Sequence, residues 1–259
     1  MRVDVLLVEK GFAPSRAQAQ ELIAKGRVFL NEGGARRPIA KASYKVDPKN
    51  YDAIEVDADH VDAKFVSRGG VKMTGALERT RFQVGKISVL DIGISTGGFS
   101  DCLLQAGADR IVGVDVGHDQ LAKKLRDDPR VTLVEGVNAR DLSGVPLVRL
   151  NKGSKFDLIV IDVSFISLTL VLPQAIQYLK ESASIIALVK PQFEVGREGL
   201  GKNGIVKDVS LYGEVESKIR RACEQAGLAV EDYFECCIEG TDGNREFFVF
   251  AKPSQLALV

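Results

Sequence analysis

The stretch from Ser88 to Asp115, SVLDIGISTGGFSDCLLQAGADRIVGVD, sets out a strand, a loop, a helix and a second strand. An apolar run, 88–92, leads into a glycine-rich loop, 93–98, and a helical pattern follows as far as Gly107. Glycines lack a Cβ and let a ligand approach the backbone, and the acid that ends the second strand can accept both hydroxyls of a ribose. The stretch therefore predicts a nucleoside-binding βαβ unit. The alternative is a βαβ unit whose glycines only make a tight turn.

The residues of this loop favour S-adenosylmethionine over a nucleotide that carries phosphates. The spacing is not G-x-G-x-x-G, and no lysine follows the glycines as it does in a P-loop. Asp91 would repel a pyrophosphate but suits a cationic ligand, and S-adenosylmethionine has a sulfonium, an ammonium and a ribose. We expect this cofactor to be bound by Asp91, Gly93, Ser95, Gly97, Gly98, Phe99, Asp115, Asn138 and Asp162.

The composition bounds the class of protein. The chain has 259 residues, 45% of them hydrophobic, and a formal net charge of zero, which allows one large domain with a small one beside it. Four cysteines, Cys102, Cys223, Cys236 and Cys237, have no metal-ligand spacing, so reduced thiols in a cytoplasmic protein are expected. No apolar run approaches the roughly 20 residues of a membrane helix, and the charged first residues are unlike a signal peptide. We expect neither a metal nor a membrane partner, and the oligomeric state stays open.

Residues 1–62 are predicted to form a small α+β domain. Two short helices, the second with Ser15 as its N-cap, precede a small sheet. Residues 1–50 carry ten basic and five acidic side chains, which suggests contact with a phosphate backbone, although a solvated surface is the alternative. The basic residues proposed to bind RNA are Arg16, Lys25, Arg27, Arg36 and Arg37.

Residues 63–68 are expected to be a linker, and residues 69–259 an α/β domain with a Rossmann-like, mostly parallel sheet. Five strands are expected to be parallel. Two more strands, over residues 230–237 and 246–251, are expected to add an antiparallel hairpin. A helix is predicted over 168–179. The charged, glycine-rich segment 194–206 is either a disordered loop or a lid that orders with substrate.

Polar residues follow several of these strands. Asp115, Asp162 and Lys190 lie at carboxyl ends, where open parallel sheets bind ligands. An ammonium at the end of a buried strand needs a partner, and Asp162 on the neighbouring strand can be that partner. Glu246 and Lys72 can join the same cluster. A purely structural salt bridge is the alternative.

Residues 2–31, RVDVLLVEKGFAPSRAQAQELIAKGRVFLN, resemble the small RNA-binding domain first described in a ribosomal small-subunit protein, the S-four domain. Together with this N-terminal domain, the whole chain resembles the TlyA family of haemolysin A and ribosomal RNA 2′-O-methyltransferases. The matching stretches are SRGGVK, LDIGISTGGFSD, GVDVG, FDLIVIDVSFISL, LVKPQFEVGR and NREFFVFAKP.

This resemblance implies an S-adenosylmethionine-dependent enzyme that methylates a ribose 2′-hydroxyl of ribosomal RNA, free or within a ribosomal subunit. It also implies a catalytic tetrad like that of the FtsJ-like methyltransferases, formed by Lys72, Asp162, Lys190 and Glu246. Two alternatives are an RNA-binding ribosome-assembly factor with weak or no catalysis and a haemolysin-like membrane-active protein. The absence of a spanning segment argues against the second alternative.

Overall fold

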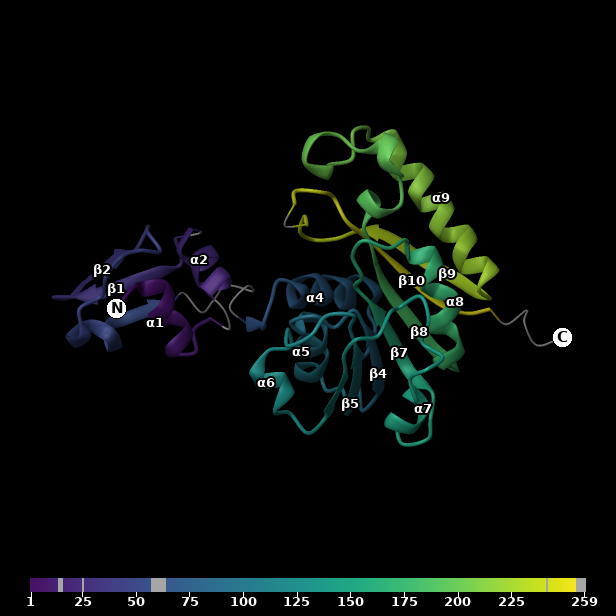
Figure 1. The fold of residues 1–259 in the computed structure, drawn as a ribbon, viewed down its shortest axis with the longest axis horizontal. Coiled ribbons are helices and arrows are strands. Elements are labelled where there is room, and N and C mark those ends of the chain that lie inside the picture. Colours follow the sequence, from purple (N-terminus) through teal and green to yellow (C-terminus); the bar gives the residue numbers. More distant parts are fainter. Residues whose placement is uncertain (14–15, 25, 57–63, 241, 255–259) are drawn as a thin grey trace. The chain divides into compact units, whose positions relative to one another are not determined.

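The chain folds as two compact units, Met1–Gly70 and Val71–Val259. A computed structural model describes residues 1–13, 16–24, 26–56, 64–240 and 242–254 (Figure 1). The predicted N-cap Ser15, the proposed RNA-binding Lys25 and the first residue of the predicted linker, Ala63, lie outside the described residues.

The first unit has two helices beside a three-stranded antiparallel sheet of order β2-β1-β3. Its elements are α1 (Val3–Glu9), α2 (Arg16–Ala24), β1 (Val28–Glu32), β2 (Ala35–Pro38), a 3₁₀ helix (Pro48–Ala53) and β3 (Ile54–Val56). The hairpin between β1 and β2 turns at Gly33 and Gly34, whose positive φ angles of 60° and 79° suit a two-residue turn. Apolar side chains of both helices, such as Leu22, pack on those of β1 to form the core.

The second unit is built on a seven-stranded sheet of order β6-β5-β4-β7-β8-β10-β9. The strands are β4 (Ser88–Ile92), β5 (Arg110–Val114), β6 (Val131–Val134), β7 (Phe156–Ile161), β8 (Leu179–Val189), β9 (Leu228–Glu235) and β10 (Phe247–Pro253). The first five are parallel, whereas β10 runs antiparallel to both of its neighbours, β8 and β9. The predicted fold class is confirmed, and β10 lies inside the sheet between β8 and β9.

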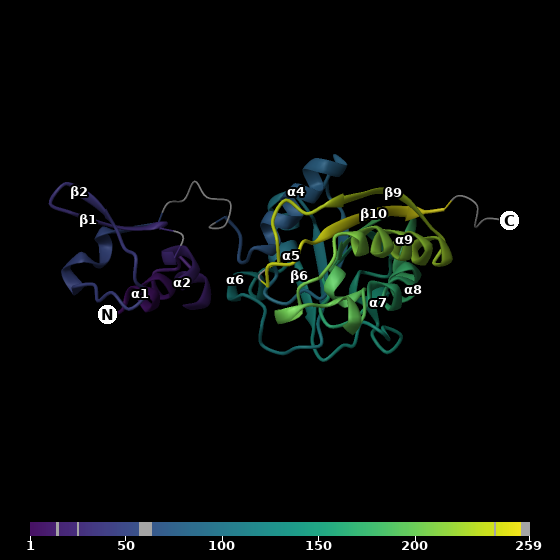
Figure 2. The same cartoon turned by 90° about the horizontal axis from the view of Figure 1, so that it is seen from above.

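Helices cover both faces of this sheet (Figures 1 and 2). They are α4 (Gly69–Thr80), α5 (Gly98–Gln105), α6 (Lys123–Arg126), α7 (Leu147–Leu150), α8 (Leu172–Ala175) and α9 (Ser210–Gln225). On one face, α9 packs Val215 and Ile219 against a core that includes Ile159 and Val249. On the other face, the ring of Phe99 in α5 lies 6.0 Å from that of Phe248. The parallel strands are therefore buried on both sides, which explains their continuous apolar sequences.

Two segments differ from the sequence prediction. The helix predicted over 168–179 is broken into a 3₁₀ turn (Leu168–Leu170), α8 and a second 3₁₀ turn (Ile176–Tyr178). Pro173 lies in the first turn of α8, where its missing N–H costs little. Segment 194–206 is folded, because Asn244 (1% exposed) accepts a hydrogen bond from the backbone N–H of Val206 and donates one to the carbonyl of Gly204.

Candidate active site

A cavity of about 450 Å³ opens at the carboxyl edge of β4, β5, β6 and β7. This is the edge at which open parallel sheets bind ligands, and the volume suits a nucleoside-sized molecule. Its lining combines acids, small residues and apolar side chains from the four loops that follow these strands. These residues are Ile92, Gly93, Ser95, Val114, Asp115, Val116, Gln120, Val137, Asn138, Ala139, Arg140, Asp162, Val163, Ser164, Phe165 and Ile166.

Five of the nine residues predicted to bind the cofactor line this cavity: Gly93, Ser95, Asp115, Asn138 and Asp162. Gly93 has a φ of 86°, and a Cβ on it would stand 2.3 Å from the carbonyl oxygen of Asp162, so only glycine lets the two loops meet. Asp115 accepts hydrogen bonds from the backbone N–H groups of Ser95 (2.8 Å) and Gly117 (2.7 Å). Its two oxygens are thereby fixed in position, and each keeps a further lone pair for a ligand.

Asp91 lies behind the cavity rather than in its wall. Its side chain is 1% exposed, and its Oδ2 accepts a 2.6 Å hydrogen bond from the hydroxyl of Ser100. Burial raises the pKa of the Asp91 carboxyl to about 7, and repulsion from Asp162 and Asp115 adds to this effect. Among the described residues, Oδ1 of Asp91 has no hydrogen-bond partner. The site therefore holds a buried carboxyl that a nearby cation would stabilise in its ionised form.

The other three predicted residues lie in and just before α5. A Cβ on Gly97 would stand 2.2 Å from Cδ1 of Leu125, so the missing side chain makes room for a protein neighbour. Gly98 begins α5, and Phe99 is buried against the sheet. The structure places none of these three among the residues that line the cavity.

Several lining residues were not predicted from the sequence. Gln120 accepts a hydrogen bond from the hydroxyl of Ser95 at 2.9 Å. Phe165 has a φ of 63° and is 88% exposed, with its ring 5.1 Å from that of Phe193. A bulky residue held with a positive φ in the open is uncommon. The sequence signal that could have identified Phe165 as a site residue is its position shortly after the polar end of β7.

Lys190, the residue after β8, lies beside this cavity. Its Nζ is 2.6 Å from Oδ1 of Asp162, which follows the neighbouring strand β7, and it donates a 2.9 Å hydrogen bond to Oγ of Ser164. The side chain of Lys190 is 12% exposed. An ammonium is thus held by two partners at the edge of an acid-lined cavity.

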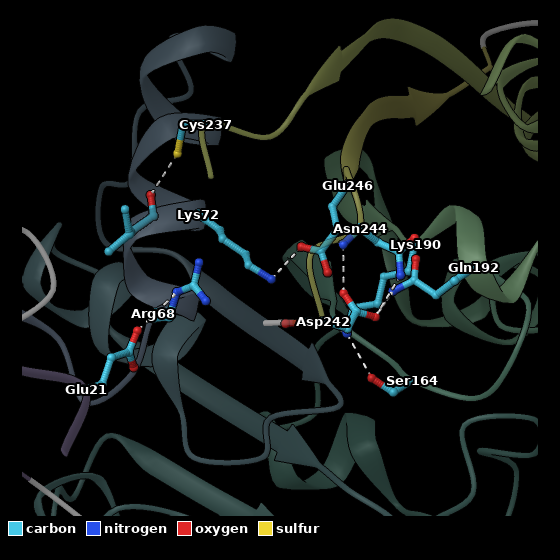
Figure 3. Close-up of polar contacts among 12 residues, drawn as sticks. Glu21, Arg68, Lys72, Ser164, Lys190, Gln192, Cys237, Asp242, Asn244 and Glu246 are labelled. Atoms are coloured by element: carbon cyan, nitrogen blue, oxygen red, sulfur yellow. Dashed lines mark hydrogen bonds and ion pairs between the residues drawn. The ribbon is translucent and has the colours of Figure 1, made fainter. Parts of the chain in front are cut away.

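Lys72 and Glu246 form a second ion pair, with 2.5 Å between Nζ and Oε2 (Figure 3). Lys72 comes from α4, and Glu246 directly precedes β10. Because Phe247 pairs with Val189 in the antiparallel register, Glu246 is placed across from Lys190. The four residues of the predicted tetrad therefore form two lysine–carboxylate pairs, both at the edge where β7 and β8 end.

The basic residues predicted to bind RNA have different surroundings in the first unit. Arg16 donates a 3.0 Å hydrogen bond to the fully buried Asp4, and the guanidinium of Arg36 lies 3.6 Å above the ring centre of Phe29. Arg37 is exposed on β2, and Arg27 is partly buried just before β1. Arg16 and Arg36 thus also hold the unit together.

A family model for FtsJ-like methyltransferases matches residues 65–252, and a model for the S4 domain matches residues 1–50. The fold and the acid-lined cavity define a Rossmann-like methyltransferase unit, and the chain belongs to the FtsJ-like methyltransferase family.

Its relatives include the 16S/23S rRNA (cytidine-2′-O)-methyltransferase TlyA of Mycobacterium tuberculosis, with 39% identity over 97% of this chain and 89% of the relative. Hemolysin A of Brachyspira hyodysenteriae is 36% identical over 95% of this chain and 98% of its own. A solved structure from Streptococcus thermophilus that carries the name hemolysin superposes with a TM-score of 0.75 at 35% identity, covering 98% of this chain and 89% of that one. These three similarities extend over both units.

Within the described part of the chain, every helix is too short or too polar to cross a membrane.

Proposed function

We propose that this protein transfers a methyl group from S-adenosylmethionine to the 2′-hydroxyl of a cytidine in ribosomal RNA. The observation that carries the proposal is the ammonium of Lys190, held by Asp162 and Ser164 at the edge of the acid-lined cavity. The cytidine and the ribosomal RNA come from the names of the M. tuberculosis relative and of the 23S rRNA (cytidine-2′-O)-methyltransferase TlyA of Campylobacter jejuni, which is 32% identical over 96% of this chain and 98% of its own.

The residues around the cavity fit this cofactor. The carboxyl groups of Asp162 and Asp115 both act electrostatically on that of Asp91, and such a cluster favours a cation over a phosphate. When bound, S-adenosylmethionine supplies a methyl group that is activated by its attachment to a sulfonium. Asp115 would offer fixed carboxylate oxygens to the ribose hydroxyls, and the unpartnered oxygen of Asp91 would stabilise positive charge.

The two ion pairs fit the chemistry of a ribose hydroxyl. This group is a weak acid, so negative charge builds on its oxygen as the proton leaves to the solvent. The ammonium of Lys190 would stabilise that charge. Asp162 and Ser164 already hold this ammonium in position before the reaction begins. Lys72 and Glu246 would orient the ribose. The largely buried pair would resist displacement, because separating its partners would leave an uncompensated buried charge.

Two surface features fit an RNA substrate. The exposed ring of Phe165 at the mouth of the cavity offers a face on which an unstacked base can stack. The S4-matching unit carries Arg37 exposed on β2, available to a phosphate group.

The test measures transfer of labelled methyl groups to ribosomal subunits from cells that lack this modification. The variant is Lys190→Met, and the matched control is Lys180→Met. Lys180 also pairs with an aspartate of β7, since its Nζ is 2.7 Å from Oδ1 of Asp157, but this pair lies at the opposite end of the two strands.

We expect Lys180→Met to transfer label at the parent rate and Lys190→Met to lose it by roughly 10²-fold or more. The labelled ribose must also resist alkaline cleavage. Label on a base would contradict the 2′-O assignment. Tight RNA binding without label in the parent would support an assembly factor instead, and leakage of liposomes by the pure protein would support the membrane-active alternative.

A further inference from the structure

Two adjacent cysteines connect the helix of Lys72 to the segment of Glu246. Cys236 and Cys237 directly follow β9, and the backbone N–H of Cys236 donates a 2.9 Å hydrogen bond to the carbonyl oxygen of Glu246. The thiol of Cys237 donates to the carbonyl of Val71, the residue before Lys72, at 3.6 Å (Figure 3). One cysteine therefore contacts each side of the ion pair.

Cys237 contacts a second residue of α4 besides Val71. A Cβ on Gly75, one turn beyond Val71, would stand 2.7 Å from Sγ of Cys237. The glycine thus leaves the space that the thiol occupies. A displacement of this sulfur therefore changes a contact with the first two turns of α4, which carry Lys72.

The two thiols differ in exposure and in acidity. Cys237 is exposed, whereas Cys236 is 8% exposed. The neighbouring thiol lowers the pKa of Cys237 and raises that of Cys236, and the charge of Lys72 favours the thiolate of both. Cys102 and Cys223 are buried, and burial raises the pKa of Cys223 to about 12. Cys237 is therefore the thiol that an oxidant in solution reaches as a thiolate.

We propose that Cys237 and Cys236 form a peroxide-sensitive thiol pair whose oxidation displaces α4 and separates Lys72 from Glu246. The loss of methyl transfer that follows rests on the proposed function. The Cys237 thiolate attacks hydrogen peroxide, a sulfur–oxygen bond forms as the oxygen–oxygen bond breaks, and hydroxide leaves. The thiol of Cys236 then displaces the oxygen from Cys237 as water, which forms a disulfide. Two electrons pass from the sulfurs to peroxide.

A disulfide between adjacent residues conflicts with the observed backbone. Consecutive Cα atoms are about 3.8 Å apart, which is shorter than the roughly 4.4–6.8 Å that disulfides usually span. Closing the ring therefore requires the backbone at 236–237 to rearrange. This rearrangement moves Sγ of Cys237 away from its contacts with Val71 and Gly75 in α4, and it changes the geometry of the hydrogen bond from the N–H of Cys236 to Glu246. Both contacts that support the Lys72–Glu246 pair are affected together.

The experiment treats the full-length chain with hydrogen peroxide and then with dithiothreitol. Three quantities are followed: the intact mass, hydrogen exchange of the backbone amides in the first turns of α4, and methyl transfer to ribosomal subunits. The variants are Cys237→Ser and Cys236→Ser. The control is Cys102→Ser, because Cys102 is buried and its Sγ has a polar neighbour 3.4 Å away, Oγ1 of Thr74.

After peroxide treatment, we expect the parent and Cys102→Ser to lose the mass of two hydrogens. Their backbone amides in α4 should exchange hydrogen faster, and most of their methyl transfer should be lost. Dithiothreitol should restore all three quantities. Cys237→Ser should keep its mass, exchange and activity, and Cys236→Ser should gain oxygen on Cys237. Equal inactivation of Cys237→Ser and the parent would overturn the proposal, as would a disulfide that leaves α4 and activity unchanged. If the untreated parent transfers no methyl group, the proposed function fails. The intact mass and the hydrogen exchange of α4 then still test whether the two thiols form a disulfide that displaces this helix.

Discussion

Replacing Asp91 by asparagine should make the protein more stable at alkaline pH. The carboxyl is 1% exposed and its pKa is raised to about 7 from 3.8. Between these two values the folded chain keeps a proton that the unfolded chain has released, so the free energy of unfolding falls as the pH rises through this window. Above pH 7 the full cost is present, and at about 1.4 kcal/mol for each pKa unit it amounts to roughly 4 kcal/mol.

The Asp91→Asn substitution removes this charge and keeps an oxygen that can accept the hydroxyl of Ser100. We expect thermal unfolding of Asp91→Asn at pH 8.5 to occur roughly 10 °C above that of the parent. The difference should shrink as the pH falls towards 5, because the parent carboxyl is then protonated. Asp119→Asn is the matched control, since the side chain of Asp119 is 89% exposed. A variant no more stable than the parent at pH 8.5 would refute the assigned cost of burying this charge.

The same charge should assist the cofactor. Binding of S-adenosylmethionine to the parent should tighten as the pH rises through about 7, where Asp91 ionises. Asp91→Asn should bind it more weakly, on the order of tenfold, and with little dependence on pH in this range. Isothermal titration at pH 6 and pH 8 measures both effects, and equal affinities of the parent at the two pH values would contradict this role.

Three further substitutions test the contacts of other residues. Arg16→Ala should cost about 1–3 kcal/mol of stability, because the buried Asp4 loses one of its hydrogen-bond donors; Arg2 first, and then Gln20 and Arg16, hold the pKa of Asp4 below its usual range. Arg37→Ala should weaken RNA binding without changing the melting temperature. RNA titrations at two salt concentrations, with thermal unfolding, distinguish the two variants. Glu194→Gln should reduce methyl transfer and stability, because the buried carboxylate accepts hydrogen bonds from Ser167 (2.6 Å) and the N–H of Leu168 (2.7 Å) and so fixes the loop of Phe165. Unchanged transfer by a variant with a lowered melting temperature would show that this loop contact is only structural.

The local elements of this protein could be predicted because their patterns lie within a few residues. The apolar run 88–92, the glycine loop and the acid at Asp115 define a βαβ unit without reference to the rest of the chain. The same loop could not reveal which glycines line the cavity. Gly93 lines the cavity and Gly97 packs on Leu125, and this difference depends on neighbours that are remote in the sequence.

The sequence by itself determined the fold class, the antiparallel pair of last strands and the identity of the polar residues at the strand ends. Only the tertiary structure placed β10 between β8 and β9, and this register sets Glu246 across from Lys190 and beside Lys72, 174 residues away in the chain. It also showed that Arg16 has a buried partner and that Cys237 touches α4. Periodicity and turn residues act over one element, whereas ion pairs and close contacts depend on strand order and register, which no local pattern encodes.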